Sequence, residues 1–176
     1  MAKKSSFFIR ASVEPSDDAI FRQTQVDLSA YVSALGKSIV KIKSIEGEWA
    51  QAEDGNIPNG APFMDGNKGG FAVWQLTTQS NTGLVALDDR TTIAKGQIWA
   101  RNPDSASNAP SQVYSDSHLP QHYSDGFLVA VEDIYLGAYA TDDWAQSSKL
   151  TYNIVLECEV LTMGASEAMA LSLSQQ

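Results

Sequence analysis

Apolar and polar residues alternate one by one along much of this chain, which is the pattern of a β-strand with one buried face. In the stretch KLTYNIVLECEVLT, residues 149–162, every second position is apolar: Leu150, Tyr152, Ile154, Leu156, Cys158 and Val160. Side chains of a strand point alternately to opposite faces, so this row lines one face only. The spacing favours β-structure over helix.

Seven more stretches are rich in Val, Ile, Tyr, Phe, Trp and Thr and are bounded by Gly, Pro, Asn or Asp, as strands are. They are SFFIRASVEP (6–15), AIFRQTQVDL (19–28), KSIVKIKSIEGEWA (37–50), GGFAVWQLTTQS (69–80), GLVALDD (83–89), TTIAKGQIWARN (91–102) and DGFLVAVEDIYLGAYA (125–140). About eight strands at these intervals predict an all-β sandwich or barrel.

One short helix is expected in DLSAYVSALG, residues 27–36, with Asp27 as N-cap and Gly36 just past its end. Its apolar residues follow the i, i+3, i+4, i+7 rule: Leu28, Tyr31, Val32 and Leu35. The tail GASEAMALSLSQQ, residues 164–176, contains helix formers but also alternates, so helix and strand both remain open there.

Two long segments, 50–70 and 101–126, are rich in turn-forming residues and are expected to be loops. The chain of 176 residues is long enough for one domain with a full core. We therefore expect residues 1–176 to form a single domain, with an N-terminal arm at 1–6 and a tail at 164–176.

The first residues, MAKKSSFFIRAS, contain only three consecutive apolar residues, so no signal peptide is expected. No run of 18 apolar residues suggests a transmembrane helix. A single cysteine excludes an internal disulfide.

The net charge of −9 is unevenly distributed: residues 1–45 carry +3 and residues 46–176 carry −12. The acidic remainder argues against a nucleic-acid-binding enzyme, because phosphate contacts need clustered cations. The mildly basic beginning, with Lys3, Lys4 and Arg10, is suited to an anionic partner.

Cys158 lies between Glu157 and Glu159, which suggests a reactive thiol or half of a metal site. Alternation places the thiol and both carboxylates on opposite faces of the strand, and neighbouring anions raise a thiol pKa rather than lower it. We expect Cys158 to be a core residue.

His118 and His122 have the spacing of a helical metal-ligand pair, but Pro120 between them prevents that helix. No phosphate-binding loop, nucleophile elbow or Cys-x-x-Cys motif is present. We expect no catalytic residues, no metal site and no cofactor, and hence a protein that is not an enzyme.

Trp74 and Trp99 lie inside apolar stretches and are expected in the core. Four other aromatic residues near strand or loop ends are candidates for subunit contacts or for stacking on sugar rings: Trp49, Trp144, Tyr114 and Tyr123.

The layout resembles the small single jelly-roll capsid proteins of viruses, especially those of icosahedral archaeal and environmental viruses. Four features carry this resemblance: the arm MAKKSS, the unit DLSAYVSALGKSIVKIKSIEGEWA, the stretch GGFAVWQLTTQS, and the closing stretch KLTYNIVLECEVLT with its tail. The likeness is one of pattern over most of the chain, without a signature motif.

The resemblance implies a single jelly-roll sandwich of about eight strands with one short helix and long loops. It implies a structural virion protein, a coat subunit that assembles with identical copies, and with other capsid proteins where these exist, into an icosahedral shell. The arm with Lys3, Lys4 and Arg10 would then face the genome or an internal membrane. Two alternatives remain: a lectin-like module that binds carbohydrate, and an enzyme built on a sandwich.

Overall fold

The computed structural model describes residues 6–15, 19–33, 38–51, 67–103, 111–141, 144 and 150–175. In these parts the chain forms nine antiparallel strands in two sheets. The strands are β1 (Phe7–Val13), β2 (Arg22–Asp27), β3 (Ser38–Gln51), β4 (Gly69–Thr77), β5 (Thr92–Arg101), β6 (Ser111–His118), β7 (Phe127–Val129), β8 (Asp133–Ala140) and β9 (Leu150–Thr162). A 3₁₀ turn, η1 (Pro120–His122), and a helix, α1 (Ala165–Ser174), complete the set.

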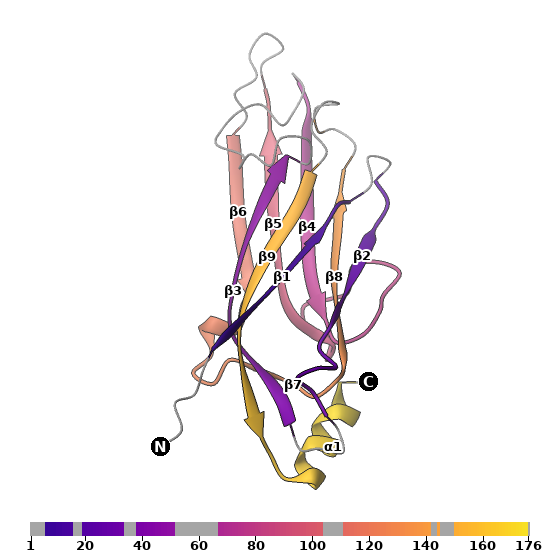
Figure 1. The fold of residues 1–176 in the computed structure, drawn as a ribbon. Coiled ribbons are helices and arrows are strands. Elements are labelled where there is room, and N and C mark those ends of the chain that lie inside the picture. The colour runs from indigo at the N-terminus through magenta and orange to yellow at the C-terminus, as the bar shows by residue number, and fades with distance from the viewer. Residues whose placement is uncertain are drawn as a thin grey trace.

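The strands pair in a nested order. One sheet runs β1-β9-β3-β7 and the other β2-β8-β4-β5-β6. Thus β1 pairs with β9, β2 pairs with β8, and β3 pairs with β7 as well as with β9. The strands β4 and β5 pair with each other as a hairpin at the centre of this nested order. This is the order of a long antiparallel ribbon rolled into two facing sheets (Figure 1). The fold is a single jelly roll.

The core between the sheets is made by the inward-facing residues of both, as the alternation predicts. At its centre, Tyr152 of β9 stacks on Trp74 of β4, with ring centroids 4.7 Å apart. Trp49 of β3 packs against Tyr152 in a tilted arrangement, with ring centroids 4.8 Å apart. These three rings join the two sheets, and aromatic contacts of this kind stabilise a core beyond the area that they bury.

The expected helix at 27–36 is wrong. Residues 29–31 form a single turn in which the amide of Val32 donates to the carbonyl of Leu28 at 2.9 Å, and the Asp27 carboxylate accepts from Ser29. Ser33 then bridges to Ser38 at the start of β3, so the chain has already reversed; residues 34–37 lie outside the described part.

The helix of the described chain is α1, in the tail that the sequence left open between helix and strand. It packs at the end of the sandwich opposite the end where β3 stops and β4 starts (Figure 1). Ala168 is buried there against Ile39 and Ala130, in a small second core. None of the helices in the described part of the chain is long and apolar enough to cross a membrane.

Two further segments have a secondary structure different from the one predicted. GLVALDD contains no strand, because its residues fold back over the five-stranded sheet: Gln75 binds the backbone of Gly83 and Val85 through its side-chain amide. Conversely, part of the expected loop 101–126 is the edge strand β6, which pairs with β5.

Candidate functional site

Cys158 is a core residue, as expected, and takes part in no cluster of reactive groups. Its side chain is completely buried among apolar residues, and burial raises the thiol pKa to about 12, with a smaller contribution from the charge of Glu157. A thiol with this pKa is protonated at neutral pH, so it is a poor nucleophile.

Glu157 lies on the outer face of the four-stranded sheet, the face turned away from the other sheet, and pairs with Lys43. Their charged atoms are 2.5 Å apart, and both side chains are part-exposed. The hydrogen bond from Lys43 holds the pKa of Glu157 below its ordinary value and raises that of Lys43. The pair is a surface ion pair, which contributes little to stability.

The two histidines lie at the ends of consecutive elements of the chain. His118 ends β6 opposite Lys95, and His122 ends η1. Among the residues that the structure describes, no group of three or more His, Cys, Asp or Glu side chains could hold a metal ion. The expectation of a protein without metal or catalysis stays a prediction.

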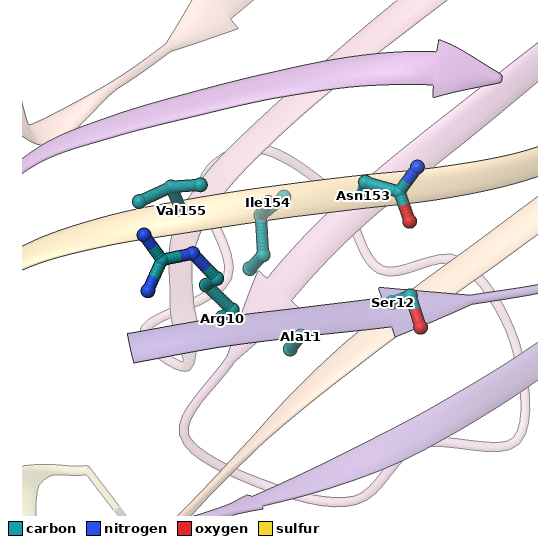
Figure 2. Close-up of a pocket in the computed structure, with 6 residues that line it drawn as sticks. All are labelled: Arg10, Ala11, Ser12, Asn153, Ile154 and Val155. Carbon is teal, nitrogen blue, oxygen red and sulfur yellow. The ribbon is translucent and has the colours of Figure 1, made fainter. Parts of the chain in front are cut away.

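A shallow hollow of about 330 Å³ lies over the paired strands β1 and β9 (Figure 2). It is lined by Arg10, Ala11, Ser12, Asn153, Ile154 and Val155. The register explains the lining, because Arg10 pairs with Val155 and Ser12 with Asn153, and paired residues share a face. The Arg10 side chain extends from β1 towards Val155.

Two exposed carboxylates flank the hollow on its far side. Glu46 and Glu48 of β3 pair with Val155 and Asn153, so they stand on the same outer face, one strand beyond β9. With strands about 4.8 Å apart, the Cα atoms of Arg10 and Glu46 are separated by about 10 Å. The hollow thus has an arginine on one side and a carboxylate pair, Glu46 and Glu48, on the other.

The opposite sheet has an exposed aromatic pair, Phe71 and Trp99, on its own outer face. They are direct cross-strand partners on β4 and β5 and are 40% and 46% exposed. Tyr139 of β8 packs beside Phe71, with ring centroids 5.8 Å apart. Arg101, exposed and two residues beyond Trp99 on β5, lies on the same face.

Three of the aromatic residues chosen from sequence, Trp49, Trp144 and Trp99, are placed otherwise than expected. Trp49 is 2% exposed and Trp144 is 7% exposed, so neither ring is available to a partner on the surface of the folded chain. Trp99, expected in the core, is exposed instead. Tyr123 is exposed, as a contact residue must be, while the side chain of Tyr114 lies outside the described part.

Of the three basic residues assigned to the arm, one lies in a strand and two lie outside the described residues. Arg10 belongs to β1 and lies on the outer face of the four-stranded sheet, not in a free arm. Lys3 and Lys4 lie outside the described residues.

A second exposed apolar surface is on α1. Met169 and Leu173, one helical turn apart, are 54% and 63% exposed, on the side away from the buried Ala168. The helix α1 lies at the end of the sandwich opposite the start of β4, where Phe71 is the third residue (Figure 1).

Comparison with known proteins gives a similarity in structure only. No protein-family model matches the chain, and no curated protein matches it.

Among solved structures, chimpanzee polyomavirus VP1 is 9% identical with a TM-score of 0.47, and the match covers 93% of this chain and 97% of that one. VP1 of trichodysplasia spinulosa-associated polyomavirus, in complex with sialylated glycooligomers, is 12% identical with a TM-score of 0.43 and the same coverage. Merkel cell polyomavirus VP1, in complex with GD1a oligosaccharide, is 10% identical with a TM-score of 0.37, covering 92% of this chain and 97% of that one. These similarities are too low to assign a family or a function.

The alternation of β5 indicates that Trp99, one member of the aromatic pair, lies on the outer face. Ile98 and Ala100 are core residues, so strict alternation already places Trp99 between them on the outer face. The sequence contains no comparable signal for the hollow, because its lining residues come together only through the pairing of β1 with β9.

Proposed function

We propose that this chain is a structural virion protein, a coat subunit that assembles with identical copies into a closed icosahedral shell. The observation that carries the proposal is the distribution of its exposed apolar side chains over several sides of the molecule. The aromatic pair lies on the five-stranded sheet, Phe8 on the four-stranded sheet, and Met169 and Leu173 on α1.

Single exposed apolar residues are normal on a monomer, but grouped ones mark interaction sites. A subunit of a closed shell contacts neighbours on several sides through different surfaces. Two grouped surfaces in different parts of the chain, the aromatic pair and Met169 with Leu173, therefore favour a shell subunit over a protein with one partner. The jelly roll, with its four strand edges, is compatible with such packing.

The orientation of the chain in the shell would follow from its charges. The segment with Lys3 and Lys4 precedes β1 and would face the genome or an internal membrane, and the acidic remainder would keep particles soluble. The whole chain would act as one domain located in the virion, with Tyr123 as a further contact residue and other capsid proteins as further partners. Kinship with archaeal or environmental viruses is part of the same proposal.

The carbohydrate-binding alternative is weakened by the burial of Trp49 and Trp144, two of its four candidate stacking residues. The aromatic pair Phe71 and Trp99 is the remaining surface on which a sugar would stack. This alternative requires a stable small species that binds glycans.

Electron microscopy of the purified chain, together with a glycan-binding screen, distinguishes the two functions. We expect closed particles of uniform diameter, formed without added glycan. A chain that stays monomeric at all salt and protein concentrations, and binds a glycan saturably through Trp99, would refute the shell.

A further inference from the structure

We propose that the aromatic pair of one copy inserts into the hollow of the next copy, with Arg101 facing the carboxylate pair. The inference rests on the proposed function, because it names the subunit contact from which a shell would be built. Its occupant is a second copy of this chain.

The protruding part of the contact is the aromatic pair with its arginine. Phe71 and Trp99 stand side by side on adjacent strands, and Tyr139 supports Phe71 from the third strand. Exposed Trp and Arg residues are the types that most often dominate binding energy at interfaces. Lower on the same face, the segment after β4 covers the sheet through the bonds of Gln75, so the aromatic pair is the uncovered part.

The receiving part is the hollow over β1 and β9. Its volume, about 330 Å³, is at the lower end of the range of about 300–1,000 Å³ found for small-molecule pockets. It therefore has room for an aromatic side chain. Val155 supplies an apolar floor, and the guanidinium of Arg10 is placed to lie over an inserted indole ring.

Charge complementarity fixes the partner and its orientation. The protruding surface carries a cation, Arg101, beside the indole, and the hollow carries the carboxylates Glu46 and Glu48 beside its floor. With the indole against Arg10, Arg101 meets the carboxylates on the other side of β9. The reverse orientation would place the two arginines together, which is unfavourable.

The two surfaces lie on opposite sheets of one chain, so the contact is heterologous. Each copy would offer one protruding surface and one hollow, and a contact of this kind builds rings or open chains rather than a closed dimer. That property separates it from an aromatic-to-aromatic dimer, in which both copies use the same surface.

The test uses two variants of the full chain. Trp99→Ala with Arg101→Ala removes the protruding surface, and Glu46→Arg with Glu48→Arg removes the charges of the hollow. We expect each change to weaken assembly in sedimentation velocity by at least about tenfold. Thermal unfolding checks that both variants fold. The matched control is Leu87→Ala with Arg22→Glu, an equally exposed apolar residue and an exposed arginine elsewhere, and it should assemble like the wild type.

Mixing the two variants gives the decisive result. Each variant keeps the surface that the other lacks, so an equal mixture should form heterodimers that grow no further. Combining Arg101→Glu with Glu46→Arg and Glu48→Arg in one chain should restore assembly, because the charges are then exchanged. Wild-type assembly by both variants, a mixture that stays monomeric, or a wild-type chain that is itself monomeric would each overturn the contact.

The outcomes also separate this contact from the shell. Heterodimers in the mixture with open oligomers from the wild type would support the contact and refute the shell. Closed particles from the wild type and from both variants alike would support the shell and refute the contact.

Discussion

Cys158 illustrates how a residue's chemistry depends on the direction in which its side chain points. Two glutamates adjoin it in sequence, yet it lies in the core opposite Phe7 and Ile42, its partners on the flanking strands. The alternation of β9 was enough to predict this. Of the neighbouring carboxylates, Glu157 lies on the outer face and acts on the thiol through its charge, whereas Glu159 is itself buried, so the alternation of β9 ends at that residue.

Cys158→Ser should lower the free energy of unfolding by about 1–3 kcal/mol, because a hydroxyl would be buried without a partner. Cys158→Ala, which buries no polar atom, should cost less than the serine variant in urea unfolding.

In the native protein the thiol should resist labelling at pH 8. The thiol pKa rises from 9.0 to about 12 on folding, so wild-type stability should fall as the pH rises above about 9, since the unfolded chain loses the proton first. Rapid labelling of the folded protein would contradict this account.

Gly47 is an exposed residue of β3, opposite Ile154, at which a side chain would point towards Tyr152. A Cβ atom there would overlap the hydroxyl and ring of Tyr152, the residue that stacks on Trp74 and packs tilted against Trp49. The absence of a side chain is thus what lets the central aromatic ring reach its place.

Gly47→Ala should destabilise the fold by about 1–3 kcal/mol, because Tyr152 must shift in a packed core. The control is Gly83→Ala, where a Cβ would meet nothing within 4 Å, and which should change stability by less than about 0.5 kcal/mol. Equal midpoints of the two variants in thermal unfolding would show that the core adapts to the extra atom.

At the scale of elements, the strands were predictable and the exceptions have physical reasons. The edge strand β6, SQVYSDSH, is polar because an edge strand pairs on one side only and is protected from aggregation by polar residues. Its composition therefore matched a loop. GLVALDD has the composition of a strand, but its backbone is held by the side chain of Gln75 instead of by a neighbouring strand.

The helix was predicted at the wrong place because tertiary pairing overrides the local helical pattern. The segment 27–36 has helical spacing, but Ser33 pairs with Ser38, so the chain turns into β3 after one turn. The tail became helical because its end is fixed by tertiary contacts. Gln175 donates to the carbonyl of Leu128 at 2.6 Å and accepts from the amide of Ala130 at 3.0 Å.

Gln175→Ala should release α1 from the body, because two buried backbone groups lose their partner. The expected cost is about 1–3 kcal/mol. Hydrogen exchange at the Ala130 amide should accelerate far more than at the core strands. Gln25→Ala, an exposed glutamine bonded to Asp133, is the control and should leave that amide protected. Unchanged exchange in the Gln175 variant would contradict the role of this residue as a clamp.

At the scale of the whole molecule, the nested strand order was predictable as a fold class but not as a register. Which residues of the two outer faces would lie together depends on the pairing of β1 with β9 and of β9 with β3. Arg10 and Glu46 are 36 positions apart in sequence, and nothing in either stretch indicates that they flank one hollow. The aromatic pair depends likewise on the pairing of β4 with β5.

The measurement that tests the central claim most directly is the mass of the purified chain in solution as a function of its concentration, by light scattering. A shell predicts a sharp transition above a threshold concentration, from small species to particles of one fixed mass that is a whole-number multiple of 19.0 kDa. A mass that stays at that of a single chain over the whole range would contradict the account.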